Sequence, residues 1–304
     1  MKWNPFNSKI GLALGGGAAK GIAHIGVLEA LEEEDIHIAY ISGTSIGALV
    51  ASYYAFGKRI EEIKRIGEGL NFKTVIGLSL HKKGIFSTKS IESMILRDLG
   101  NVNIEDSNIP LAICTTDIST GEQVILRQGN LAKAVCASVA VPGIFVPIEI
   151  NGRTLVDGGI TENVPITPLD KMGAGITVGI NLNGNQQYPP PKDMIAIMSN
   201  AIDMAIDLRT RDQLKQADIT LSLNLNRYSR LDNSGQFDDL YHEGYQSAKK
   251  KLSKLLWYKK THYFYYLKNL IKIIAPIKIP DILMLKKLFW LRANRKKDKH
   301  GLRR

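Results

Sequence analysis

Two short apolar runs near the N-terminus each end in a glycine-bearing turn and then continue as a helical pattern. The first covers residues 9–14, which precede the glycine loop 15–21 and a run of apolar residues at helical spacing from Ile22 to Leu31. The second covers residues 36–41, which lead through residues 43–47 into a small-residue helical pattern that reaches Phe56. Strand, helix, strand and helix in this order predict an α/β fold built on a mainly parallel sheet.

The same alternation continues through the middle of the chain. Further strands are predicted at residues 109–117, 123–127, 153–156, 175–181 and 217–225, and helices at 131–138 and 194–212. Pro142 ends the helix that precedes it, because proline cannot continue the hydrogen-bond ladder.

The second turn has the sequence Gly43-Thr44-Ser45-Ile46-Gly47. Gly-x-Ser-x-Gly between a strand and a helix is the pattern of a nucleophile elbow, in which a strained turn presents the serine hydroxyl. Gly43 and Gly47 lack the Cβ atoms that would clash in such a turn. The N–H groups that begin the following helix favour developing negative charge. Ser45 is therefore a candidate nucleophile.

Two other glycine-bearing turns also follow predicted strands, the loop 15–21 and Asp157-Gly158-Gly159. Because the carboxyl ends of parallel strands share one edge of a sheet, we expect these turns to meet Ser45 there. Asp157 supplies an acid or base, and Gly16, Gly17 and Ala18 supply N–H donors. Together with Ser45, these groups are sufficient for acyl transfer.

Four ordered motifs resemble those of the patatin-like phospholipases, specifically the bacterial single-domain kind. They are Gly15 to Gly21, Gly43 to Gly47, Ala137 to Phe145, and Asp157-Gly158-Gly159 with Asn163-Val164-Pro165. The match runs from about residue 10 to 170 and more weakly to 244. The resemblance implies a three-layer α/β/α fold with a mainly parallel central sheet. It divides the chain into a catalytic domain at 9–248, with core motifs at 11–171, and a basic tail at 249–304.

The resemblance implies a Ser–Asp dyad that hydrolyses lipid acyl esters through an acyl-enzyme, without a metal or organic cofactor. In this dyad Ser45 is the nucleophile and Asp157 accepts its proton. The oxyanion would be held by the amides of Gly16, Gly17 and Ala18. The motif residues that support the site are Gly15, Lys20, Gly21, Gly43, Gly47, Gly158 and Gly159. We expect Gly158 and Gly159 to let the backbone turn sharply. The loop departs from the commonest family pattern, because aligning it on Lys20-Gly21 places Ala18 where a third glycine is usual.

Other interpretations of these residues were weighed. A dinucleotide site would require an acidic residue at the end of the second strand, where Ser42 and Gly43 stand instead. Lys20 is not followed by Ser or Thr, so a P-loop is not indicated, and we interpret it as a helix-start residue or a surface charge. His24 is interpreted as a histidine packed on its helix rather than as a triad base. Ser138 either lines the pocket or caps a turn, and Asp117 is a structural strand end.

The net charge of +11 comes from one end of the chain. Residues 249–304 carry 18 Lys or Arg against two Asp, and the remainder is mildly acidic. Leucines at helical spacing after Ala248 predict a basic amphipathic helix, which favours an anionic membrane surface over nucleic acid. A solvated basic extension remains the alternative.

The two cysteines, Cys114 and Cys136, fit neither a disulfide framework nor a zinc site, and they indicate a reducing compartment. The start of the chain is too polar for a secretory signal, and no transmembrane segment is predicted. We therefore expect a cytoplasmic protein that is peripheral at the inner face of the membrane. An esterase or thioesterase for soluble acyl compounds and a non-catalytic lipid-binding protein are the alternative functions.

Overall fold

A central sheet of mixed strand direction organises the part of the chain described by this computed structural model. The described residues are 9–70, 77–81, 84–185, 187–188, 190–192, 194–229 and 235–251. They all belong to a compact unit that covers residues 1–260. Most of the predicted basic tail, from residue 252 onward, therefore lies outside the described residues.

Within the described residues, the sheet has eight strands in the order β10-β9-β1-β2-β5-β8-β7, and β6 also pairs with β5. The strands are β1 Ile10–Leu14, β2 Ile38–Thr44, β5 Leu111–Asp117, β6 Gln123–Leu126, β7 Ile148–Ile150, β8 Arg153–Asp157, β9 Ile176–Asn181 and β10 Ile219–Ser222. A separate antiparallel hairpin pairs β3 Gly77–His81 with β4 Gly84–Ser87.

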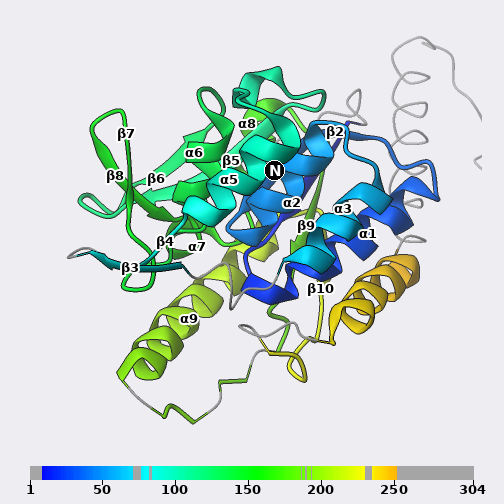
Figure 1. Cartoon of the computed structure of the whole chain (residues 1–304). Helices are drawn as coiled ribbons and strands as arrows, with labels where there is room; N and C mark the ends of the chain where they lie inside the picture. The colour runs from blue at the N-terminus through cyan, green and yellow to red at the C-terminus, as the bar shows by residue number, and fades with distance from the viewer. Residues whose placement is uncertain are drawn as a thin grey trace, which may run out of the picture. The chain divides into compact units, whose positions relative to one another are not determined.

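Helices cover both faces of this sheet, which confirms the α/β prediction (Figure 1). They are α1 Ile22–Glu32, α2 Ile46–Ala55, α3 Ile60–Gly69, α5 Lys89–Leu99, α6 Leu131–Ser138, α7 Gly159–Glu162, α8 Thr167–Met172 and α9 Met194–Gln213. Short 3₁₀ helices are η1 Ala18–Gly21, η2 Ile104–Asp106 and η3 Leu214–Gln216. Residues 237–251 are also helical.

The core lies on both sides of β1, whose five residues are all buried. Leu12 and Leu14 belong to the large cluster formed with α1, α2, α3, α5 and α6. Ala13 points the other way and packs with Val164 and Leu169 near α8. Alternate side chains of a strand face opposite sides, so an uninterrupted apolar strand is stable only between two helix layers.

The sheet differs from the expected arrangement at the strand that carries Asp157. β1, β2, β5, β9 and β10 are parallel, as predicted, whereas β8 pairs antiparallel with both β5 and β7. The reasoning that parallel strand ends bring Asp157 to the edge is therefore wrong. β8 instead runs inward from beyond the end of β5, because Leu155 pairs with Asp117 and Asp157 pairs with Thr115.

Cys114 and Cys136 are both free and buried. No helix in the described part of the chain is long and apolar enough to cross a membrane.

Candidate active site

Ser45 occupies the turn between β2 and α2 with a backbone conformation that non-glycine residues rarely adopt. Its φ is 56° and its ψ is −127°, a combination that costs of order 1–3 kcal/mol unless the surroundings hold it. The surrounding glycines explain how the turn fits. A Cβ on Gly47 would lie 2.1 Å from the carbonyl oxygen of Leu14, and one on Gly43 would lie 2.5 Å from Ala48 Cα. The steric reason given for both glycines is confirmed.

Ser138 connects the turn at Ser45 to strand β5 through two hydrogen bonds. Its hydroxyl accepts a 2.8 Å hydrogen bond from the Ser45 N–H and donates a 2.7 Å bond to the carbonyl oxygen of Cys114. The Ser138 side chain is fully buried at the end of α6. Of the two expected roles, the hydrogen bond to the Ser45 turn fits the capping of a turn, because the Ser138 hydroxyl satisfies an N–H of that turn. Ser138 positions the backbone of Ser45, a role that the sequence motif around it did not reveal.

Asp157 comes to the same region from β8. Thr44 pairs with Cys114 across β2 and β5, and Thr115 pairs with Asp157 across β5 and β8. Ser45 and Asp157 thus lie at neighbouring levels on either side of β5, two strand spacings or roughly 10 Å apart at the backbone. The Asp157 side chain is buried, and its Oδ1 accepts a 2.7 Å hydrogen bond from the Gly159 N–H.

Close packing against β5 explains the glycine at position 158, directly after Asp157. Gly158 has φ −68°, an ordinary helical value, and Gly159 begins α7. A Cβ on Gly158 would lie 2.3 Å from the carbonyl oxygen of Cys114. Glycine is required there because the chain passes against β5, and not because the backbone turns sharply.

Asn163 connects this segment to the glycine loop. Both its backbone oxygen and its Oδ1 accept from the Gly16 N–H at 3.2 Å. A Cβ on Gly16 would lie 2.7 Å from Asn163 Oδ1 and 3.2 Å from Ser45 Cβ. The loop, Asn163 and the nucleophile candidate are thus in direct contact. Sequence reasoning did not assign Asn163 to the site, although Asn163-Val164-Pro165 was among the motifs of the resemblance.

The hydrogen bonds of the glycine loop show which of the predicted N–H donors already have an acceptor in the protein. Gly15 N–H donates to the carbonyl oxygen of Ile180, and Gly16 N–H donates to Asn163. Within the described residues, the N–H groups of Gly17 and Ala18 have no hydrogen-bond acceptor. The Gly16 N–H is thus engaged by Asn163, whereas in the described part of the chain the other two predicted donors are not engaged in this way. Ala18 has φ 51°, a left-handed conformation that explains why glycine is usual at this place.

His24 forms a hydrogen bond to the glycine loop from the buried side of α1. It is fully buried on α1, with Nε2 2.8 Å from the carbonyl oxygen of Gly15. Burial lowers the pKa of His24 to about 4, so the ring is neutral at pH 7 and Nε2 donates to the carbonyl. The interpretation of His24 as a packed histidine is confirmed.

Lys20 and Asp117 complete the set of residues singled out in the sequence. Lys20 is only 1% exposed in η1, so its interpretation as a surface charge is wrong. Asp117 is a structural strand end, as expected: its Oδ1 accepts from the Ser119 N–H, and Arg153 lies 3.5 Å away.

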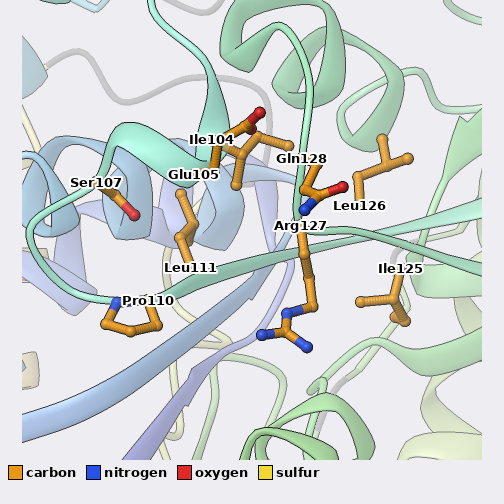
Figure 2. Close-up of a pocket in the computed structure, with 9 residues that line it drawn as sticks. All are labelled: Ile104, Glu105, Ser107, Pro110, Leu111, Ile125, Leu126, Arg127 and Gln128. Carbon is orange, nitrogen blue, oxygen red and sulfur yellow. The ribbon is translucent and has the colours of Figure 1, made fainter.

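A pocket elsewhere on the molecule is lined by none of the candidate site residues described above. Figure 2 shows that it lies beside the first residue of β5, Leu111, and the last residue of β6, Leu126. The pocket is therefore at the opposite end of β5 from Thr115, which pairs with Asp157. Among the described residues, no group of three or more His, Cys, Asp or Glu side chains could hold a metal ion.

Comparison with known proteins places these features in a family. Residues 12–170 match the family model described as patatin-like phospholipase. An uncharacterized NTE family protein of Mycobacterium tuberculosis is 37% identical over 184 residues, which make up 60% of this chain and 51% of that protein. Lysophospholipase nte1 of Emericella nidulans is 29% identical over an alignment of 288 residues, covering 81% of this chain and 18% of that protein.

The chain therefore spans about half the length, or less, of these curated relatives. The crystal structure of VipD from Legionella pneumophila has a similar fold. It superposes with a TM-score of 0.58 at 17% sequence identity, over 81% of this chain and 67% of that chain.

Proposed function

The chain belongs to the patatin-like phospholipase family, and from that premise we propose that it hydrolyses the carboxylic esters of lipids with a Ser45–Asp157 dyad. The observation that carries this proposal is the contact between the strained Ser45 turn and the glycine loop, with Asp157 at the neighbouring level of the sheet. A lysophospholipase among the relatives supports a lipid ester as the substrate class.

In the proposed reaction, Ser45 Oγ attacks the ester carbonyl carbon while its proton passes to the Asp157 carboxylate. The tetrahedral intermediate then expels the alcohol, which takes up this proton, and an acyl-enzyme remains. Water attacks the acyl-enzyme as Asp157 again accepts a proton, and the fatty acid leaves with Ser45 restored. A carboxylate is a weak base for a hydroxyl, so the transfer requires direct contact between Ser45 Oγ and the Asp157 carboxylate, which is buried.

The oxyanion that forms during each attack would bind to the N–H groups of Gly17 and Ala18. The neighbouring Gly16 lies close to the Ser45 side chain, since a Cβ on Gly16 would be 3.2 Å from Ser45 Cβ, and this places the loop near the carbon under attack. Helix α2 begins at Ile46, directly after the nucleophile, and the positive end of its dipole adds to the stabilisation of the oxyanion. The contacts of Asn163 and His24 with the loop keep its amides oriented before the substrate arrives.

A fluorophosphonate probe and a lipid-panel hydrolysis assay test the dyad. We expect the wild-type chain to be labelled and Ser45→Ala to lose both labelling and hydrolysis. Ser52→Ala is the matched control, since Ser52 is a buried serine of α2 whose hydroxyl bonds to Ala48 within the helix. Asp157→Asn should reduce hydrolysis by about 10²–10⁴-fold. An unlabelled wild-type chain, or a Ser45→Ala variant that still hydrolyses esters, would contradict the proposal.

We also propose that the basic tail attaches the enzyme to an anionic membrane surface, as a peripheral protein. The charge excess of residues 249–304 supports this, since each Lys or Arg near such a surface contributes about 1 kcal/mol. Lys249 is already paired with Glu33 and Glu34, so the charges available to lipid begin beyond it. Binding to vesicles that contain phosphatidylglycerol should weaken steeply with added salt. Binding that salt does not affect would remove the role given to the tail.

A further inference from the structure

Helix α9 exposes an apolar side to solvent along most of its length. Between residues 194 and 208, the positions described as exposed carry only methionine, isoleucine, leucine and alanine. Several of these side chains are among the most exposed large hydrophobic residues described: Met194 at 75%, Ile197 at 56%, Met198 at 49%, Met204 at 42% and Leu208 at 63%. An ordinary surface helix has the opposite polarity.

The polar side of α9 faces the protein and holds the helix in this orientation. Asp207 is buried and accepts hydrogen bonds from Tyr188 Oη at 2.6 Å and from Asn183 Nδ2 at 3.3 Å. Gln213 Nε2 donates to the carbonyl oxygen of Thr161 at 2.6 Å. Rotating the helix to bury its apolar side would break these bonds and expose buried polar partners. The exposure of the apolar side is therefore part of the fold.

Helix α9 adjoins the segments that carry the candidate active site. A Cβ on Gly159, two residues after Asp157, would lie 3.4 Å from Cδ1 of Ile206, a half-buried residue of α9. A Cβ on Gly143 would lie 3.7 Å from Met198 Cε. Gly143 belongs to the apolar loop that follows Ser138, so the exposed side of α9 reaches this loop through Met198.

Charged groups of both signs flank the apolar side. Lys192 precedes α9 and is followed in the sequence by Asp193, while Arg209, Arg211 and Asp212 are exposed at the other end of the helix. Between Met194 and Leu208 the acidic residues are Asp203, which is half-buried, and Asp207, which is buried. An apolar helical side bordered by polar and charged groups is typical of helices that lie in the membrane interface.

We propose that this exposed side of α9 contacts lipid and seats the active site on a membrane. The inference rests on the proposed function, because lipid esters are the substrates that such an orientation would deliver. A second copy of the chain fits less well. The side is about 21 Å long and one helix wide, or roughly 200 Å², whereas a stable dimer buries about 800 Å² on each partner.

Flotation with phosphatidylcholine–phosphatidylglycerol vesicles tests the proposal. The parent is the full chain carrying Ser45→Ala, so that lipid is not consumed and binding is measured independently of hydrolysis. Salt of about 1 M suppresses the contribution of the tail, because charges are then screened within roughly 3 Å. Adding Ile197→Gln and Leu208→Gln should raise the apparent Kd at least about ten-fold. Leu96→Gln, which changes a leucine exposed on α5, should leave the Kd unchanged.

Three results would overturn the proposal. The parent chain could fail to float with the vesicles in high salt, or the double variant could bind as tightly as the parent. Gel filtration could also show a dimer that the double variant converts to a monomer, in which case a second copy covers α9. Failure of the proposed function is recognised separately, since it appears as wild-type protein that neither hydrolyses esters nor reacts with the fluorophosphonate.

Discussion

Replacing Ser138 by alanine should both destabilise the protein and slow its reaction with a fluorophosphonate. The Ser138 hydroxyl is fully buried and serves two backbone groups, the Ser45 N–H at 2.8 Å and the Cys114 carbonyl oxygen at 2.7 Å. An unsatisfied buried polar group costs about 1–3 kcal/mol. The two groups together predict a loss of roughly 2–4 kcal/mol in the free energy of unfolding.

Urea unfolding followed by circular dichroism measures this loss, and Ser52→Ala provides the comparison. Ser52 is equally buried, but its hydroxyl donates to Ala48, whose carbonyl stays within the hydrogen-bonded helix when the hydroxyl is removed. We expect Ser52→Ala to cost at most about 1 kcal/mol. The difference between the two variants isolates the cost of releasing the Ser45 turn.

The rate of labelling reports on geometry separately from stability. Because Ser138 holds the N–H of the nucleophile itself, its loss lets the strained turn relax, and a misplacement of about 1 Å lowers reaction rates on the order of 10²-fold. The rate is measured in the absence of urea, where each variant is folded. A Ser138→Ala variant that matches Ser52→Ala in stability and labels at the wild-type rate would refute the reasoning.

Two further predictions concern His24 and Gly47. The pKa of His24 is about 4 in the folded chain and 6.5 when unperturbed, so only the unfolded state gains this proton as pH falls between those values. The free energy of unfolding should therefore decline by up to about 3 kcal/mol as the pH falls through that range. The His24→Gln variant should lack this part of the decline. Parallel curves of unfolding free energy against pH for the two proteins would argue against this role of His24. In Gly47→Ala the new Cβ would lie 2.1 Å from the Leu14 carbonyl oxygen, so the free energy of unfolding should fall by about 2–3 kcal/mol. In Gly69→Ala the new Cβ has no atom within 4 Å, so the free energy of unfolding should not fall. Equal urea midpoints for the two variants would count against the steric argument.

Much of the sheet and several helices could be predicted because their signals are local. The strands that became β1, β5 and β6, and the helices α1, α6 and α9, lie within two residues of their predicted bounds. Turn glycines and apolar periodicity are properties of neighbouring residues, so they can be read directly from the chain. No element was predicted in residues 58–108, although the structure has α3, the β3–β4 hairpin and α5 there.

Contacts between distant segments could not be predicted in the same way. The assignment of the Gly16 N–H to Asn163 joins residues separated by 147 positions, and the bond between Ser45 and Ser138 joins residues separated by 93. Each role depends on which atom of one segment meets which atom of another. No spacing within either segment encodes that meeting.

The sequence by itself determined the turn that holds Ser45, the glycines around it, and the order of the motifs, because local steric and helix-forming preferences decide these features. Only the tertiary structure decided the direction of β8, the hydrogen bond from the Gly16 N–H to Asn163, and the outward orientation of the apolar side of α9. The pattern of residues 194–212 predicts a helix. Its outward side follows from the hydrogen bonds that Asp207 accepts from Tyr188 and Asn183, which form only when separate segments pack together.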